Sequence, residues 1–173
     1  MPLSYGKPAA KNAILPLLTT FSFSAPEAYL DFLQLKNGLA VKSPDYCNLP
    51  YHGVERGEVA FSALFGIDTR NKYYDLKYYN DEFLEELDFL SGALLIGDDP
   101  GGNFFVLING GDREGVYYWD RTHLHCEDDI QQFDIAEQQE CGNLYKVAPD
   151  FTIFYQMILQ HACTQGEICL DDL

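Results

Sequence analysis

The strongest pattern of hydrophobic positions lies between Gly92 and Asp120, where three short apolar runs alternate with clusters of Gly, Pro, Asn and Asp. Runs of this kind are typical of β-strands joined by tight turns. Because the connections are too short for a crossover helix, we expect the three strands to pair antiparallel as a meander. The middle run, Phe104 to Ile108, has no polar alternation, which predicts a central strand covered on both faces.

A helix is predicted in the segment 24–38. Ser24 and Glu27 have the spacing of a capping box, and Pro26 between them suits the first turn of a helix. The apolar positions that follow lie on one helical face. Asn37-Gly38 then provides a left-handed exit, so the helix should end in a turn.

The rest of the chain before the meander is less regular. At most a short helix is expected in residues 1–20, because Pro8 and Pro16 interrupt them. Val59 to Ile67 alternates with period two and predicts a strand. Asn80 is predicted to cap a second helix that runs through Leu90.

After Asp120 the sequence changes character. The segment 127–142 is acidic and rich in glutamine, which predicts an exposed insertion. Leu144 to Val147 favours one more edge strand, and Pro149 opens a final helix with an apolar face. The acidic tail, 166–173, is expected to fray.

This order of elements predicts the fold class and the domain organisation. Helices near both ends and a mostly antiparallel sheet between them are typical of an α+β protein with helices packed on the sheet. The length of 173 residues suits one domain. We therefore expect a single domain over residues 1–173, with its core at about 20–160.

Charge restricts the partners that this domain would bind. Lys and Arg number 11 against 27 Asp and Glu, which gives a formal net charge of −16. Such a surface repels nucleic acid and anionic membranes. It suits a positively charged protein partner, and keeping the protein in solution is an equally good explanation of the charge. No apolar run approaches the roughly 20 residues that cross a bilayer. The N-terminus lacks the pattern of a secretory signal, and the five scattered cysteines suit reduced thiols, so we expect a cytoplasmic protein.

Two sequence clusters are candidate chemical sites. Asp98-Asp99-Pro100-Gly101-Gly102 has glycines but lacks the Lys and Ser/Thr of a phosphate-binding loop, and a turn between strands is favoured. His123, His125 and Cys126, with Cys141 further on, form the only metal-like cluster. Their spacing matches no standard zinc motif, so we expect neither a metal nor a cofactor, and no catalytic residue is assigned.

Aromatic residues offer a second kind of candidate. Trp119 closes the last strand of the meander, where a core position is favoured. Four tyrosines lie in the polar connection before the second predicted helix: Tyr73, Tyr74, Tyr78 and Tyr79. Tyrosine is enriched at interfaces, although packing over the sheet explains some of these residues equally well.

Three motifs in chain order carry a resemblance to a known family. They are Ala25-Pro26 with Tyr29, Phe32-Leu33 and Asn37-Gly38; then Ile96 to Asp99, Gly101 to Asn103 and Val116 to Asp120; and finally Tyr145 to Ile158 with Phe151 and Phe154. Together they resemble the SUKH superfamily, which includes bacterial immunity proteins and fungal cell-wall-synthesis regulators. The sequence departs from the pattern in having Ala25 where Leu is usual and a longer, more acidic insertion after Asp120.

The resemblance implies an α+β fold, no catalysis and, for bacterial members, direct binding to a toxin. We therefore expect an immunity protein that neutralises a protein toxin, for example a basic nuclease, through an acidic surface. The candidate contacts are Glu127, Asp128, Asp129, Asp134 and Glu137 first, then Asp98 and Asp99, with Tyr73 and Tyr74 as aromatic candidates. The alternatives are a cytosolic scaffold or regulator of the same fold and a metal-dependent enzyme that uses His123, His125 and a cysteine.

Overall fold

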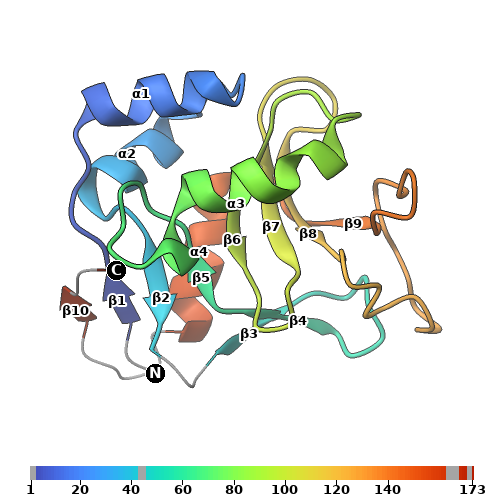
Figure 1. Ribbon diagram of the computed structural model, residues 1–173. Coiled ribbons are helices and arrows are strands. Elements are labelled where there is room, and N and C mark those ends of the chain that lie inside the picture. The colour runs from blue at the N-terminus through green and yellow to red at the C-terminus, as the bar shows by residue number, and fades with distance from the viewer. Residues whose placement is uncertain (1–2, 43–45, 163–167, 171–172) are drawn as a thin grey trace.

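The computed structural model describes residues 3–42, 46–162, 168–170 and 173, and Figure 1 shows the arrangement of its elements. In chain order these are β1 (Leu3–Tyr5), α1 (Lys11–Thr20), α2 (Glu27–Leu35), β2 (Leu39–Val41), β3 (Cys47–Pro50), β4 (Glu58–Phe61), β5 (Ala63–Leu64), the 3₁₀ turn η1 (Lys72–Tyr74), α3 (Leu76–Phe83), the 3₁₀ turn η2 (Leu84–Leu87), β6 (Ala93–Asp98), β7 (Phe104–Ile108), β8 (Gly115–Trp119), β9 (Leu144–Ala148), α4 (Phe151–Ala162) and β10 (Ile168–Leu170).

The described strands form one large sheet and one hairpin. The large sheet has eight strands in the order β10-β1-β2-β5-β6-β7-β8-β9, and β3 pairs with β4 in a separate two-stranded sheet. The pairings within the large sheet are antiparallel except that of β1 with β10. The meander predicted between Gly92 and Asp120 is confirmed as β6, β7 and β8, and the α+β fold class is confirmed with it.

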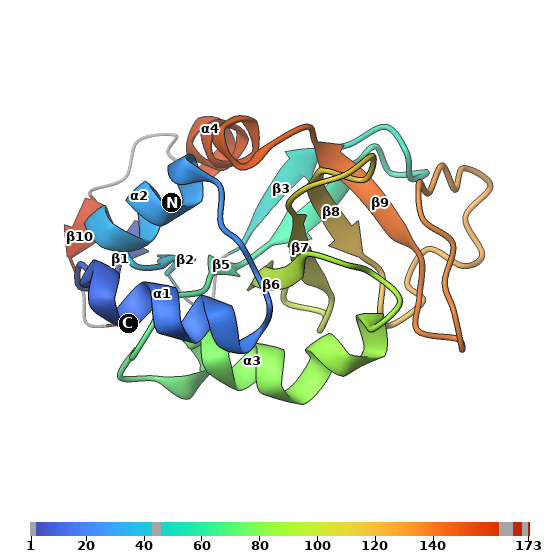
Figure 2. The same ribbon diagram turned by 90° about the horizontal axis from the view of Figure 1, so that it is seen from above.

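Strand β7 is the centre of the core, as predicted from its unbroken apolar run. On one face Phe104 packs against Trp119 and against Tyr79 of α3, with ring centroids 5.7 and 5.4 Å apart. Neighbouring Phe105 points to the opposite face, where its ring lies 5.0 Å from that of Phe154 in α4. Helices α3 and α4 therefore cover opposite faces of the sheet, as the view from above in Figure 2 shows.

Helix α2 starts later than the sequence predicts. Pro26 occupies the N-cap position with ψ of 151°, and no side chain caps the first turn, so the predicted capping box of Ser24 and Glu27 is wrong. Proline holds the extended conformation that an N-cap needs without any side-chain hydrogen bond. The left-handed exit is confirmed, because Asn37 and Gly38 have φ of 47° and 104°.

Helix α3 also starts at a different residue. Asp75 is its N-cap and accepts a hydrogen bond from the backbone N–H of Tyr78 at 3.0 Å. The prediction that Asn80 caps a helix through Leu90 is therefore wrong, since Asn80 lies inside α3. The helix ends at Phe83 and a 3₁₀ turn, Leu84–Leu87, follows it.

Three other predictions meet a mixed outcome. The single strand expected at Val59–Ile67 is two strands, β4 and β5, which belong to different sheets. The edge strand after residue 143 and the final helix are confirmed as β9 and α4. The prediction of a frayed tail over 166–173 is wrong for Ile168–Leu170, which pairs with β1; residues 166–167 and 171–172 lie outside the described residues.

Candidate functional site

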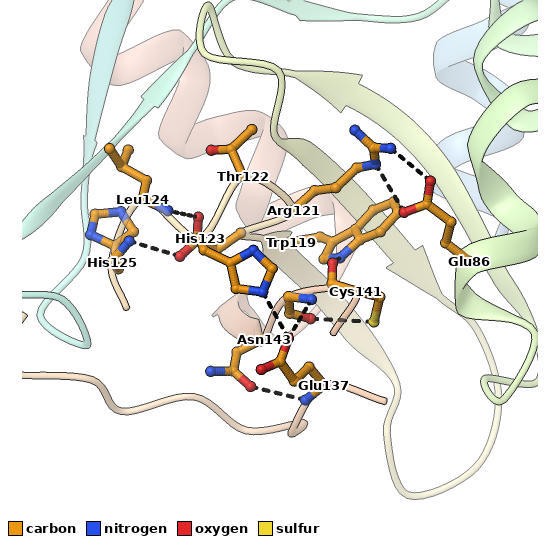
Figure 3. A network of polar contacts seen from close by, with 12 residues as sticks. Glu86, Trp119, Arg121, Thr122, His123, Leu124, His125, Glu137, Cys141 and Asn143 are labelled. Carbon is orange, nitrogen blue, oxygen red and sulfur yellow. Dashed lines mark hydrogen bonds and ion pairs between the residues drawn. The ribbon is translucent and has the colours of Figure 1, made fainter. Parts of the chain in front are cut away.

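The segment between β8 and β9, residues 120–143, is irregular but held by its own polar contacts (Figure 3). The buried carboxylate of Asp120 accepts the backbone N–H groups of Leu124 and His125 at 2.7 and 2.8 Å. At the other end, the indole N–H of Trp119 donates to the carbonyl oxygen of Cys141 at 2.8 Å. Trp119 is fully buried, as predicted for a core residue, and it ties both ends of the segment to the sheet.

Glu137 closes a second set of contacts within this segment. One carboxylate oxygen lies 2.9 Å from Nε2 of His123 and accepts the backbone N–H of Gly142 at 2.8 Å. The hydrogen bond from His123 and that from Gly142 lower the pKa of the Glu137 carboxyl below its usual value. Asn143 in turn accepts the backbone N–H of Glu137 at 2.9 Å. Glu137, proposed from sequence as a partner contact, is exposed but also holds the segment together through these contacts.

Two further anchors connect the segment to other elements. The guanidinium of Arg121 donates to both carboxylate oxygens of Glu86, at 2.9 and 2.7 Å, and lies 4.5 Å from the ring centroid of Phe83. On the opposite side, the backbone N–H of Gln132 donates to the carbonyl oxygen of Gly53 at 2.8 Å. The insertion predicted over 127–142 is exposed along most of its length, and these bonds fix its course.

His125 and Asp128 form a pair in the middle of the segment. Nδ1 of the buried His125 ring lies 2.8 Å from a carboxylate oxygen of Asp128. The same oxygen accepts the backbone N–H of Glu55 at 3.3 Å. The Nε2 atom of His125 is buried and has no hydrogen-bond partner among the described residues. Asp128 therefore acts inside the protein rather than as a solvated surface charge.

The two histidines of the metal-like cluster contact different carboxylates. His123 pairs with Glu137 and His125 with Asp128, while the thiol of Cys141 contacts the carbonyl oxygen of Gly142 at 3.6 Å. In the described part of the chain, no group of three or more His, Cys, Asp or Glu side chains is arranged to hold a metal ion.

The segment exposes both apolar and acidic side chains. Leu124, Ile130 and Phe133 expose 61%, 42% and 42% of their surface. Glu127 and Asp129 lie among them in the sequence, are exposed, and have no hydrogen-bond or ion-pair partner among the described residues. These five exposed residues lie close together in the chain and are called the 124–133 face below: Leu124, Glu127, Asp129, Ile130 and Phe133. Asp134, next to Phe133, is also exposed but accepts the backbone N–H of Lys146 at 2.6 Å.

Asp99 lies in the predicted turn between β6 and β7 but is buried rather than solvated. Its carboxylate accepts four hydrogen bonds, from the backbone N–H groups of Gly101 and Asn103, the side-chain amide of Asn103 and the hydroxyl of Tyr118, at 2.7, 2.9, 3.0 and 2.8 Å. Asp99 therefore organises the turn and is not a free charge for a partner.

The neighbouring Asp98, at the end of β6, is half-buried. Its Oδ1 atom is buried without a hydrogen-bond partner among the described residues. Burial and, second, the nearby charge of Asp99 raise the pKa of the Asp98 carboxyl to about 8. The carboxyl is therefore mostly neutral at pH 7, which argues against a role in attracting a basic partner.

The four tyrosines of η1 and α3 serve mainly in packing. Tyr79 stacks on Phe65 with ring centroids 4.3 Å apart, and Tyr74 packs against Ala40 and Ala63. Tyr73 remains 57% exposed. Figure 1 places the start of α3 near β2, away from the segment 120–143 beyond β8 and β9, so Tyr73 and the 124–133 face belong to different parts of the surface.

The fold defines an α+β domain with a central antiparallel meander and helices on both faces, and the candidate site is a tethered surface segment. The SMI1 / KNR4 family (SUKH-1) model matches residues 8–157. The chain therefore belongs to this family, in agreement with the resemblance of its motifs. Members are generally non-enzymatic immunity or regulatory proteins that bind other proteins.

Comparison with curated proteins and with solved structures gave no match. None of the described helices has the length and apolar character needed to cross a membrane.

Proposed function

We propose that this chain is an immunity protein that binds and neutralises a basic protein toxin in the cytoplasm, without catalysis. Membership of the SUKH-1 family supports the broader class, a protein that binds other proteins. The specific observation behind the proposal is the 124–133 face, in which three exposed apolar side chains accompany two carboxylates that have no described partner.

This combination suits recognition of a basic protein. Large apolar side chains supply most of the binding free energy of an interface, because they are removed from water when the partner docks. Carboxylates around them accelerate encounter with a cationic surface and disfavour anionic competitors. With 11 basic against 27 acidic residues, the field of the whole molecule acts in the same direction.

The contacts beneath the face supply the rigidity that such an interface needs. Asp120 fixes the backbone at Leu124, and the bond from Gln132 to Gly53 fixes the backbone next to Phe133. An exposed segment that is already ordered loses little conformational entropy on binding. Toxins that cleave nucleic acid need a cationic cleft, so a nuclease is the class of toxin best matched to an acidic, pre-formed surface.

A regulatory scaffold is the second candidate. Exposed Tyr73, with the Lys72 ammonium 5.2 Å from its ring centroid, offers another polar–aromatic surface away from the 124–133 face. A scaffold would use both surfaces to bind different proteins. An immunity protein would need the 124–133 face alone.

Co-expression tests the proposal. The product of the neighbouring open reading frame is expressed in a bacterial host alone and together with this chain, and growth is measured. We expect the neighbour to arrest growth alone and growth to be restored in the presence of this chain but not of a variant with Phe133→Asp. If the Phe133→Asp variant restores growth as well as the unmodified chain does, the 124–133 face is not part of the interface. If the neighbouring gene product does not arrest growth and several proteins are recovered bound to this chain, the scaffold is favoured.

A further inference from the structure

A surface groove of about 600 Å³ lies between the end of α1 and the stretch that runs from α3 to the start of β6. Figure 2 shows α1 and α3 next to each other. The apolar part of the lining consists of the core residues Leu87 and Leu90 and the partly buried Leu84 and Phe21. An apolar lining that is open to water can bury an apolar side chain of a partner.

Three carboxylates follow one another along the α3–η2 side of this groove. They belong to Asp81, Glu85 and Asp88, and all three residues are exposed. Residues four apart in an α-helix, or three apart in a 3₁₀ turn, lie on the same face, so the three side chains form one line beside the apolar residues. Glu85 and Asp88 are roughly 6 Å apart along this line, at about 2 Å per residue.

The chain itself neutralises only the first of these charges. Asp81 pairs with Lys77, whereas the side chains of Glu85 and Asp88 have no hydrogen-bond or ion-pair partner among the described residues. Asp88 also occupies the C-cap of η2, where the free carbonyl groups disfavour a negative charge. Like charges at this spacing destabilise the helix that carries them. A cation from outside the chain would offset both costs.

The lining determines the chemistry of the partner. Carboxylates beside an apolar surface repel nucleic acid and anionic lipid, and they favour a protein segment that presents Lys or Arg next to an apolar side chain. In a helix, side chains at positions i and i+4 are about 6 Å apart, which matches the spacing of Glu85 and Asp88, and an apolar residue at i+3 lies beside them. A second copy of this chain fits badly, because two molecules of net charge −16 repel each other.

We propose that this groove binds a cationic amphipathic helix of another protein. Two Lys or Arg side chains one helical turn apart would pair with Glu85 and Asp88, and the apolar residue between them would cover Leu84. The inference goes beyond the proposed function and does not rest on it. The groove shares no lining residue with the 124–133 face, so the two surfaces are separate binding sites.

Titration with a synthetic peptide tests the groove in the purified full chain. The probe is the N-acetylated, C-amidated octapeptide Lys-Ala-Ala-Leu-Lys-Ala-Ala-Leu, and the ¹⁵N-amide signals of the protein are followed at low salt. We expect saturable shifts at Ser22, Glu85 and Ser91, which line the groove, and none at Asp129 or Ile130. A peptide with Glu in place of Lys should not bind. A peptide with Ser in place of Leu should bind about 30-fold more weakly, the effect of burying one leucine.

A pair of charge variants assigns the binding to the groove. Glu85→Gln with Asp88→Asn removes both charges at nearly constant shape, and the Kd of the octapeptide should rise about tenfold at low salt and much less at high salt. Glu127→Gln with Asp129→Asn makes the same change in net charge on the 124–133 face and should leave the Kd within twofold. All four positions are exposed, so neither variant disturbs the core.

Four results would overturn the proposal. The first is that the octapeptide does not saturate, and the second is that the peptide with Ser or the peptide with Glu binds equally well. The third is that the two double variants have equal effects, because net charge alone would then explain the binding. The fourth is that the free protein forms a dimer in which the groove is protected, because the groove would then belong to a second copy.

The outcome is independent of the co-expression test. Saturable binding of the octapeptide in the groove without any growth rescue would keep the groove as a binding site and overturn the immunity function. Rescue without peptide binding would keep the immunity function and overturn the groove.

Discussion

The side-chain amide of Asn80 pairs with the backbone of Leu95 as a neighbouring strand would. Its nitrogen donates to the carbonyl oxygen of Leu95 at 2.8 Å, and its oxygen accepts the N–H of the same residue at 2.9 Å. Asn37 makes the equivalent two bonds to Ile67, at 2.9 and 2.7 Å. Both asparagines thus satisfy backbone groups that the sheet leaves unpaired, and Asn80 connects α3 directly to β6.

Asn80→Ala should destabilise the fold by about 3 kcal/mol, because it leaves two buried backbone groups of Leu95 without partners. Urea denaturation followed through the buried Trp119 measures the change. Asn48→Ala is the matched control, since its amide makes one exposed bond to Glu58, and it should cost less than about 1 kcal/mol. Equal losses for the two variants would show that the Leu95 bonds contribute nothing.

Asn80 also shows why the sequence predicted some elements and not others. Asparagine is common at helix starts, and the local pattern predicts that role for Asn80. The actual cap, Asp75, lies in the tyrosine-rich stretch, where the sequence predicts a connection. The partner of Asn80 is 15 residues away in β6, and no local pattern encodes such a contact. The meander, in contrast, depends on short apolar runs separated by turn residues, and both are local features of the sequence.

The same limit applies to strand pairing and to the site. The alternation at Val59–Ile67 predicted extended backbone correctly, but it does not reveal that β4 pairs with β3 and β5 with β2 and β6. In the candidate site, the acidic composition of 127–142 predicted an exposed segment, and most of its residues are exposed. Asp99 is bonded to Tyr118, Asp128 to His125 and Glu137 to His123. The sequence does not reveal these contacts, because only the folded chain brings the partners together.

Asp98 should make stability depend on pH. Its pKa is about 8 in the folded protein, against an ordinary value of 3.8, so between these values the folded state holds a proton that the unfolded state has released. The free energy of unfolding should therefore fall as the pH rises from about 4 to about 8. Asp98→Asn, which cannot ionise, should be more stable than the parent at pH 8, with a smaller difference at pH 5.

Urea midpoints at the two pH values measure this effect. The exposed Asp112, in the turn between β7 and β8, provides the control substitution Asp112→Asn. A gain for Asp98→Asn that is identical at pH 5 and pH 8 would be inconsistent with a raised pKa.

Gly142 should tolerate no side chain. Its φ is 97°, and an added Cβ would lie 2.1 Å from the carbonyl oxygen of Asp120. Gly110 has a similar φ of 91° but open space around the added atom. Both Gly→Ala variants bear the cost of a left-handed conformation, about 1–2 kcal/mol. Gly142→Ala should lose roughly 2 kcal/mol more because of the clash and should accelerate amide exchange in the segment 120–143. Equal stability of the two variants would argue against the close contact with Asp120.

Charge reversal tests the role of the exposed carboxylates in partner binding. Glu127→Lys with Asp129→Lys should slow association with the toxin identified by co-expression by about tenfold at low salt, with little difference at high salt. Asp31→Lys with Glu82→Lys makes the same change in net charge at exposed positions on α2 and α3 and is the control. If both double variants slow association equally, only the net charge matters and the 124–133 face has no special part.

The apolar residues of the face should act on dissociation instead. Phe133→Ala should raise the Kd roughly 30-fold, as expected for an anchor worth about 2 kcal/mol, mainly through a faster off-rate. Leu35→Ala, at an exposed apolar position on α2, is the matched control and should leave the Kd within twofold. An unchanged off-rate for Phe133→Ala would place the interface elsewhere.

The order of strands has a practical consequence for these measurements. β10 and β1 form one border of the large sheet and β9 the other, which separates them by roughly 30 Å at about 4.8 Å per strand spacing. An affinity handle or fluorophore attached ahead of β1 or after β10 would sit on the far side from residues 120–143 (Figure 1). The protein can therefore be immobilised on a sensor by either end of the chain while the 124–133 face stays open to an incoming molecule.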